Sequence, residues 1–261
     1  MIRALFFGDV VGRIGRNCFL EQLPRIKRSF NPDLIIVNGE NSAKGKGITS
    51  KICKAYYNSG VDCITSGNHI YDNREILDKM NDLPYLIRPM NYPSKNPGNT
   101  IFRTKINNSE IAIVNFLGQV FMPPTDNPFT IMEYLLEHEL NDTPFIFVDF
   151  HGEATSEKKA FAYHFKKRVS VIMGSHTHVQ TSDAEVIDQH TAYITDVGMI
   201  GAKNSILGMK PDPALHRFLT NMPSRLDPPD DDHDMIFNFI SVDIDDDGKA
   251  TKIEAFDRFN F

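Results

Sequence analysis

The chain has 261 residues, 41% hydrophobic and 24% charged, which is the composition of an ordinary globular protein with one large α/β domain or two small ones. Its net charge of −6 disfavours a nucleic-acid binder that relies on a broad basic surface. Three cysteines without C-x-x-C spacing disfavour a disulfide scaffold or a cysteine zinc site, and no apolar run reaches the roughly 20 residues of a membrane span.

The first part of the chain alternates between apolar runs and segments with helical spacing. Thr49 is placed to cap a helix, Pro24 predicts a kink in the preceding one, and Asp72 or Asn73 is expected to cap a short helix over 74–80. This alternation predicts a parallel sheet covered by helices. The strands are expected at residues 2–7, 34–37 and 61–65, and the helices at 19–30 and 49–59.

The middle of the chain is irregular. Residues 84–98 and 118–129 are long loops rich in proline or polar residues, and between them residues 101–105 and 110–116 predict a hairpin. Loops of this length in a compact domain are usually functional or mobile. We therefore expect these two loops to wall a substrate cleft.

The remaining part returns to alternation and ends in strands. Ser156 is expected to cap a helix, and the acidic residues 230–232 are expected to form a solvated loop rather than a calcium site. We expect no linker and a single domain over residues 1–261. The further elements are expected as helices at 131–136, 156–164 and 213–221, and strands at 145–149, 169–173, 185–187, 191–195, 236–244 and 252–259.

Polar residues follow five of the predicted strands at the point where each strand ends. In open α/β sheets the carboxyl ends of the strands are where sites are built. Each residue alone is most simply a turn residue, a helix cap or a structural histidine. Five strand ends with the same property are better explained by one shared site. The residues concerned are Asp9, Glu40, Asn41, Asn68, His69, His151, His176 and His178.

The donor types in this set point to metal ions. Without His69 there remain two carboxylates, two amide oxygens and three imidazoles, which is too many for one tetrahedral zinc. Two adjacent metals, usually about 3.5–4 Å apart and bridged by a carboxylate, would use all of them. Oxygen and nitrogen donors without thiolate favour iron or manganese, with zinc or magnesium as alternatives.

The combined motifs resemble the calcineurin-like metallophosphoesterases, and most closely their YmdB-like bacterial branch. The likeness covers essentially the whole chain and includes residues 149–157 and 193–199. It implies an α/β sandwich of two β-sheets flanked by helices. The motifs that carry it are Gly-Asp-Val-Val-Gly at 8–12, Asn-Gly-Glu-Asn at 38–41, Gly-Asn-His at 67–69 and His-Thr-His-Val-Gln-Thr at 176–181.

Two departures from the wider superfamily match that branch. The usual Asp-x-His is Asp9-Val10-Val11 here, and Glu40 with Asn41 beside it replaces the usual bridging aspartate. The resemblance implies two metals that share Glu40 as a ligand. The first metal would be held by Asp9, Glu40, Asn41 and His178. The second metal would be held by Glu40, Asn68, His151 and His176.

His69 adjoins the ligand Asn68, so we expect it to lie beside the metals without binding them. The hypothesis is a phosphodiesterase in which a hydroxide bridging the two metals attacks phosphorus and His69 protonates the leaving oxygen. The alternative for His69 is a hydrogen bond to a metal ligand. The resemblance makes 2′,3′-cyclic nucleotides the leading substrates. The residues alone do not distinguish them from other phosphate esters.

Other functions stay open at this point. The same fold could serve as a non-enzymatic regulatory or scaffold module, a phosphomonoesterase or an RNA nuclease. The acidic balance makes a small phosphodiester the expected partner rather than long nucleic acid, and no membrane partner is expected. The chain start is too short for a signal peptide, so a cytoplasmic location is expected. A homo-oligomer is expected only from the family resemblance.

Overall fold

The computed structural model describes residues 1–231 and 234–257, in which strands form two large sheets and a small one. The first sheet has the order β14 (Ala250–Phe256), β13 (Phe239–Ile244), β1 (Ile2–Phe7), β3 (Leu34–Asn38), β4 (Cys63–Thr65). The second has the order β5 (Ile101–Ile106), β6 (Ser109–Leu117), β7 (Phe145–His151), β8 (Val171–Ser175), β10 (Thr191–Ile194), β9 (Glu185–Ile187). The small sheet has the order β12 (Met235–Phe237), β11 (Met199–Ala202), β2 (Asp9–Val10).

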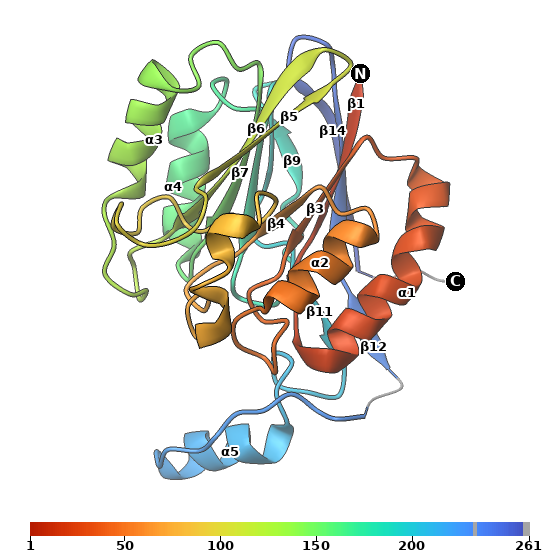
Figure 1. The fold of residues 1–261 in the computed structure, drawn as a ribbon, viewed down its shortest axis with the longest axis vertical. Coiled ribbons are helices and arrows are strands. Elements are labelled where there is room, and N and C mark those ends of the chain that lie inside the picture. The colour runs from red at the N-terminus through yellow and green to blue at the C-terminus, as the bar shows by residue number, and fades with distance from the viewer. Residues whose placement is uncertain (232–233, 258–261) are drawn as a thin grey trace.

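Helices cover the outer faces of both large sheets, as Figure 1 shows. Helices α1 and α2 lie on the first sheet and α3 and α4 on the second, while α5 lies away from these layers. The sandwich of two sheets flanked by helices that the resemblance implied is therefore confirmed. The helices are α1 (Gly12–Phe30), α2 (Ser50–Asn58), α3 (Pro128–His138), α4 (Thr155–Phe165) and α5 (Pro211–Thr220).

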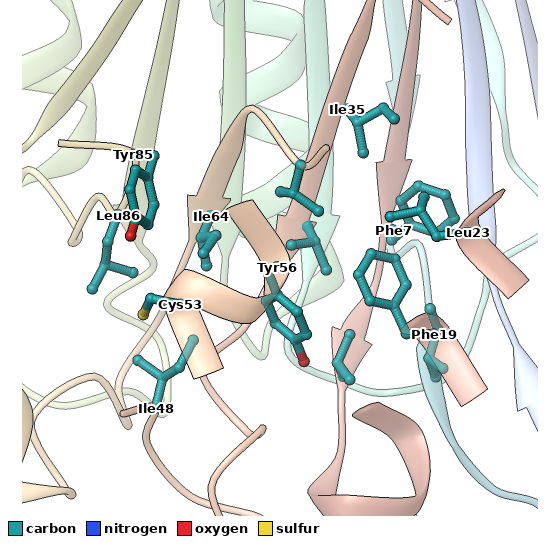
Figure 2. Packing of buried hydrophobic residues seen from close by; sticks show 14 of the residues in the cluster. Phe7, Phe19, Leu23, Ile35, Ile48, Cys53, Tyr56, Ile64, Tyr85 and Leu86 are labelled. Atoms are coloured by element: carbon teal, nitrogen blue, oxygen red, sulfur yellow. The ribbon is translucent and has the colours of Figure 1, made fainter. Parts of the chain in front are cut away.

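The alternation of side chains along β1 builds two cores at once. Ile2, Ala4 and Phe6 belong to the apolar cluster between the two sheets, whereas Leu5 and Phe7 belong to the cluster under α1 and α2. Successive residues of a strand point to opposite faces, so a strand that is apolar throughout has both faces covered. In Figure 2 the rings of Phe7 and Phe19 lie together, with centroids 5.1 Å apart.

The second sheet follows the same rule. Ile113 in β6 and Phe147 in β7 point into the core between the sheets, and Val114 and Val148 point into the cluster under α3 and α4. Strands β6, β7, β8 and β10 are parallel neighbours, as are β1, β3 and β4. The carboxyl ends of the parallel strands in each sheet therefore lie at one edge.

Most predicted elements are present, and several differ in extent. The strand predicted over 236–244 is interrupted at Asn238, whose side-chain oxygen accepts a hydrogen bond from the Met199 backbone N–H at 3.1 Å. This contact lets the chain pass from the small sheet (β12) to the first sheet (β13). Strand β11 is an additional element that the sequence pattern does not predict.

Two helix predictions need correction. The helix expected over 74–80 is two 3₁₀ turns, Arg74–Ile76 and Met80–Asp82, and Asn73 rather than Asp72 caps the first. Helix α4 begins after Ala154 without a side-chain cap, so Ser156 is not its N-cap. Residues 258–259 of the last predicted strand and Asp232 of the acidic loop lie outside the described residues. Among the described residues, no helix combines the length and apolar character of a membrane span.

Candidate metal centre

The expected donor residues come together at the carboxyl ends of the strands of both large sheets. Each residue lies in a strand or just after one, so the hydrogen-bonded sheets hold its backbone in place. Asp9 lies in β2, Glu40 and Asn41 follow β3, Asn68 follows β4, His151 ends β7, and His176 and His178 follow β8.

Three donor atoms converge on Nε2 of His151. Oε1 of Glu40 lies 2.9 Å from it, and Oδ1 of Asn68 and Nδ1 of His176 each lie 3.1 Å from it. Metal–ligand bonds of about 2.1 Å place neighbouring donors roughly 3.0–3.4 Å apart. The spacing of these four side chains therefore fits a shared metal ion, and Glu40, His151 and His176 have the mutual spacing of a metal-binding group.

A second set of donor atoms lies around Asp9. Its Oδ1 is buried without a hydrogen-bond partner, and so is Oδ1 of Asn41. Nε2 of His178 lies 3.7 Å from the Asp9 oxygen. The Asn41 amide nitrogen donates to the Gly45 carbonyl at 3.3 Å, which leaves its oxygen as the unused donor. Buried polar atoms rarely lack a partner, so each of these two oxygens is free to be a ligand of a cation.

Gly67 shows how closely the chain approaches this centre. A Cβ atom there would lie 2.3 Å from His151 Nε2 and 2.4 Å from Glu40 Oε2. Any side chain at this position would occupy the space between donors from two different strands. The requirement for glycine thus comes from the close approach of the backbone to the donor cluster.

The buried carboxylates make the centre favourable for positive charge. Burial alone would raise the pKa of Asp9, but coulombic attraction from the neighbouring His178 and His151 imidazoles brings it below its ordinary value. Burial likewise lowers the pKa of His151, yet Glu40 and Asp9 outweigh it and raise that pKa to about 9. Two carboxylates that hold a proton on a buried imidazole would also attract a metal cation.

A relay of buried polar groups orients His151. The Ser175 hydroxyl donates to Asp149 Oδ1 at 2.6 Å. The Ser175 hydroxyl oxygen in turn lies 2.9 Å from His151 Nδ1. Because the hydroxyl proton goes to Asp149, the imidazole Nδ1 is the donor to Ser175. In the neutral imidazole Nε2 then faces Glu40, Asn68 and His176 with its lone pair available, so a metal that bound there would take the place of the proton.

The turn that carries the two later histidines is held by a buried ion pair. His176 and His178 have φ values of 103° and 63°, which are unusual for residues other than glycine. Lys158 donates to the Ser175 carbonyl and to Asp196, both at 2.8 Å. The other contacts restrain the turn from its amide side: Thr177 N–H donates to Asp196 at 3.0 Å and His176 N–H donates to Asp9 at 3.2 Å.

His69 lies beside the donors with its ring turned to another partner. Its Nδ1 is 2.8 Å from Oδ2 of Asp72, and its backbone N–H donates to Glu40 Oε2 at 2.9 Å. A carboxylate that accepts from Nδ1 fixes the tautomer and leaves Nε2 for proton transfer. His69 also lines the cavity next to the donors, where a substrate would lie.

That cavity has a volume of about 540 Å³, and its wall differs from the expectation. The loops 84–98 and 118–129 were expected to form the cleft, but neither contributes a described residue to its lining. Residues between 206 and 226, including part of α5, form the wall instead. The loops do come near the donor residues, since the Gly118 N–H donates to the His151 carbonyl at 2.9 Å, but they do not line this cavity.

Sequence reasoning missed the residues that support the donors. Asp149 could have been noticed, because it lies two positions before His151 and so on the same face of β7. Asp72 lies three residues after His69, within reach of a turn. For Lys158 no local signal exists, because its partners come from residues 175 and 196.

Comparisons with known proteins find relatives that match nearly the whole chain. A family model described as "YmdB-like protein" matches residues 5–256. A Bacillus subtilis protein named 2′,3′-cyclic-nucleotide 2′-phosphodiesterase is 45% identical over 254 residues, covering 97% of this chain and 96% of the relative. A Mycoplasma pneumoniae crystal structure, described as a novel phosphatase, is 33% identical with a TM-score of 0.92, covering 98% and 92%. A Thermus thermophilus crystal structure, described as a hypothetical protein, is 35% identical with a TM-score of 0.91, covering 98% of both chains.

Proposed function

The chain belongs to the YmdB-like protein family, and on this premise we propose that it hydrolyses 2′,3′-cyclic nucleotides at a centre of two metal ions. It is a hydrolytic phosphoesterase, like its curated relatives. The substrate class comes from the name of the Bacillus subtilis relative, which this chain matches over nearly its full length.

The donors divide into two groups that support the proposed pair of ions. Around His151 Nε2 lie Glu40, Asn68 and His176, and around the orphaned Asp9 oxygen lies His178, with a second orphaned oxygen on Asn41. Glu40 is the residue that would belong to both groups. Iron or manganese is the proposed metal because all seven donors are oxygen or nitrogen atoms.

Bound metal ions would activate the attacking water and neutralise charge on the phosphate oxygens. Everything else in the reaction falls to side chains of this chain. His69 would protonate the departing sugar oxygen, since it lines the cavity and Asp72 holds its Nδ1. Glu40 is held at the same time by the His69 backbone N–H, so the proposed acid and the proposed bridging ligand are fixed relative to each other.

The observation that carries the proposal is the convergence of donors from three other strand ends on His151 Nε2, with the His69–Asp72 pair beside it. A module that only bound a partner would have no use for an imidazole in this position. The proposed function therefore requires both metals and an open cavity of nucleotide size.

The test is hydrolysis of 2′,3′-cyclic AMP by purified protein loaded with manganese or ferrous iron. The nucleoside monophosphate product is quantified by chromatography, and the metal content is measured on the same preparation. We expect turnover that disappears after chelation and returns when metal is added. The same preparation is assayed with two control substrates. 3′,5′-cyclic AMP tests whether the size of the cyclic phosphate ring matters, and 4-nitrophenyl phosphate tests for activity on a phosphomonoester.

Absence of turnover from protein that carries two metals would contradict the proposed substrate. Faster hydrolysis of the monoester than of 2′,3′-cyclic AMP would instead favour a phosphomonoesterase. Turnover that is unaffected by complete removal of metal would contradict the proposed centre.

A further inference from the structure

The lining of the cavity next to the donor cluster has two chemically different parts. Glu40, His69, His176 and His178 form the polar part, where the phosphodiester would react. The apolar part includes Ile206, Leu207, Met209, Phe218 and Leu226. A volume of about 540 Å³ lies within the range of roughly 300–1,000 Å³ of small-molecule sites. The cavity therefore has room, beside its apolar lining, for a part of the substrate that is not charged.

Phe218 is the most conspicuous side chain of this apolar lining. It belongs to α5 and is 80% exposed, although it lines the cavity. Among the described residues that line the cavity, it is the only phenylalanine, tyrosine or tryptophan. Figure 1 shows α5 apart from the two sheets and the four helices that cover them, which agrees with the exposure of this ring. An exposed aromatic ring at the edge of a site is well placed to receive a ligand.

Two cations lie on the same lining. Lys46 comes from the glycine-rich loop that carries Asn41, and Arg217 precedes Phe218 on α5. The positive charges of these two side chains would attract an anionic substrate into the cavity. The lining thus offers metal donors, cations and a flat apolar surface to one molecule. A nucleoside cyclic phosphate has the matching parts: an anionic phosphodiester, a polar sugar and a flat base.

We propose that the apolar wall formed by Ile206, Leu207, Met209, Phe218 and Leu226 is a nucleobase subsite, and that the Phe218 ring stacks on the base. This inference rests on the proposed function, since it assigns the apolar lining of the same cavity. Stacking on a ring accepts every base, because each base has a π-face. The subsite therefore increases affinity for nucleotides over base-free diesters without selecting strongly among bases.

The test compares two substrates that differ only in the base. One is 2′,3′-cyclic AMP, and the other is methyl β-D-ribofuranoside 2′,3′-cyclic phosphate, which has the same reacting ring and no base. Phe218→Ala is expected to raise KM for cyclic AMP roughly tenfold or more, because base stacking contributes about 1–3 kcal/mol. KM for the base-free diester and kcat for both substrates should change less than twofold. Phe218→Tyr should restore the affinity for cyclic AMP.

The matched control is Leu219→Ala. Leu219 is the next residue of α5 and is 82% exposed, but it does not line the cavity. Its removal should leave KM for both substrates unchanged. Because α5 exposes further apolar residues, light scattering on each variant checks that its molar mass equals that of the parent.

Equal KM changes for both substrates, or no change for either, would overturn the subsite. If the parent hydrolyses neither substrate, the proposed function fails, and calorimetric titration of metal-loaded protein with 2′,3′-cyclic AMP then decides the subsite separately. Binding that Phe218→Ala weakens and Phe218→Tyr restores would support it. Binding that is absent, or equal in parent and Phe218→Ala, would overturn it.

Discussion

Three histidines line the cavity and a fourth, His151, lies next to His176, and the partner of the second ring nitrogen distinguishes the four. His151 is oriented by Ser175, and Nδ1 of His178 lies 2.9 Å from the Leu207 carbonyl oxygen, so both present Nε2 to the donor cluster. His176 presents Nδ1 to the cluster instead, because its Nε2 is 3.1 Å from Glu153. His69 is paired with Asp72 and presents its remaining nitrogen to the cavity. The residue type alone does not assign these roles.

Replacing His69 tests the role of general acid. His69→Ala should keep both metals and lose roughly 10²–10⁴-fold in kcat, the usual contribution of a positioned acid or base. Metal content by elemental analysis and kcat with 2′,3′-cyclic AMP are measured together. His138→Ala is the control, because His138 is exposed at the end of α3.

A leaving-group test separates the acid role from a structural one. With a diester whose leaving group is 4-nitrophenolate, which needs no protonation, His69→Ala should lose much less activity. Loss of metal from His69→Ala would contradict the assignment, as would an equal loss of kcat for both substrates.

Replacing Asn41 tests the orphaned amide oxygen. Asn41→Ala removes one donor from the group around Asp9 and leaves the group around His151 intact. We expect the metal content to fall from two ions to about one per chain after dialysis, because a missing ligand weakens one site. Asn99→Ala is a suitable control, since the Asn99 amide donates to the Leu83 carbonyl, away from the donor residues. Two tightly held ions in Asn41→Ala would rule out Asn41 as a ligand.

At the scale of elements, the junction of β8 and its histidine turn depends on α4. Lys158 on that helix and Asp196 after β10 are both almost fully buried, and together they hold the Ser175 carbonyl and the Thr177 amide. Gly174 lets β10 approach this closely, because a Cβ atom there would lie 1.7 Å from the Thr195 carbonyl oxygen. The unusual backbone of the turn is therefore restrained from two neighbouring elements.

Breaking this ion pair should cost stability. Lys158→Met leaves Asp196 buried without its cation, which typically costs about 3–5 kcal/mol in the free energy of unfolding. The neighbouring Lys159 lies 3.8 Å from Asp183 and is 45% exposed, so Lys159→Met should cost less than about 1 kcal/mol. Urea unfolding of both variants in the metal-free form measures the difference. Similar losses in the two variants would show that the Lys158 pair has no special part in holding the turn.

The strand ends were predictable because an apolar run followed by a polar residue is a local pattern, and Asp9, Glu40 and His151 lie where that pattern placed them. The wall of the cavity was not predictable, since nothing local to residues 206–226 indicates which distant segment they face. The division of residues 236–244 at Asn238 likewise depends on Met199, a partner 39 positions away.

For the whole molecule, the donor cluster connects the two sheets. Glu40 follows a strand of the first sheet and His151 ends a strand of the second, and their side chains are 2.9 Å apart. A metal held by both would join the layers at one edge. Binding to the folded form alone shifts the folding equilibrium, because the unfolded chain does not bring these donors together.

Metal removal should therefore lower the melting temperature. At a free metal concentration one hundred times Kd, binding stabilises the folded chain by about 2.7 kcal/mol. For a chain of this size that corresponds to a rise of roughly 5–10 °C in Tm, measured by calorimetry before and after chelation. The shift should depend on metal concentration and should be smaller in Asn41→Ala. A Tm that is independent of metal concentration would contradict the proposed link between the sheets.

Strand β1 is synthesised first, but its neighbour β13 is synthesised near the end of the chain, so the first sheet cannot be completed until then. All seven donor residues have been translated once the ribosome passes residue 178, but β1 pairs on one side with residues 239–244. At about 5–20 residues per second, the intervening segment takes roughly 3–12 seconds to make. Until then one edge of β1 has no native neighbour, and an unpaired edge is a template for pairing with other chains. A chain truncated within this interval would have all seven proposed donor residues and an open sheet edge.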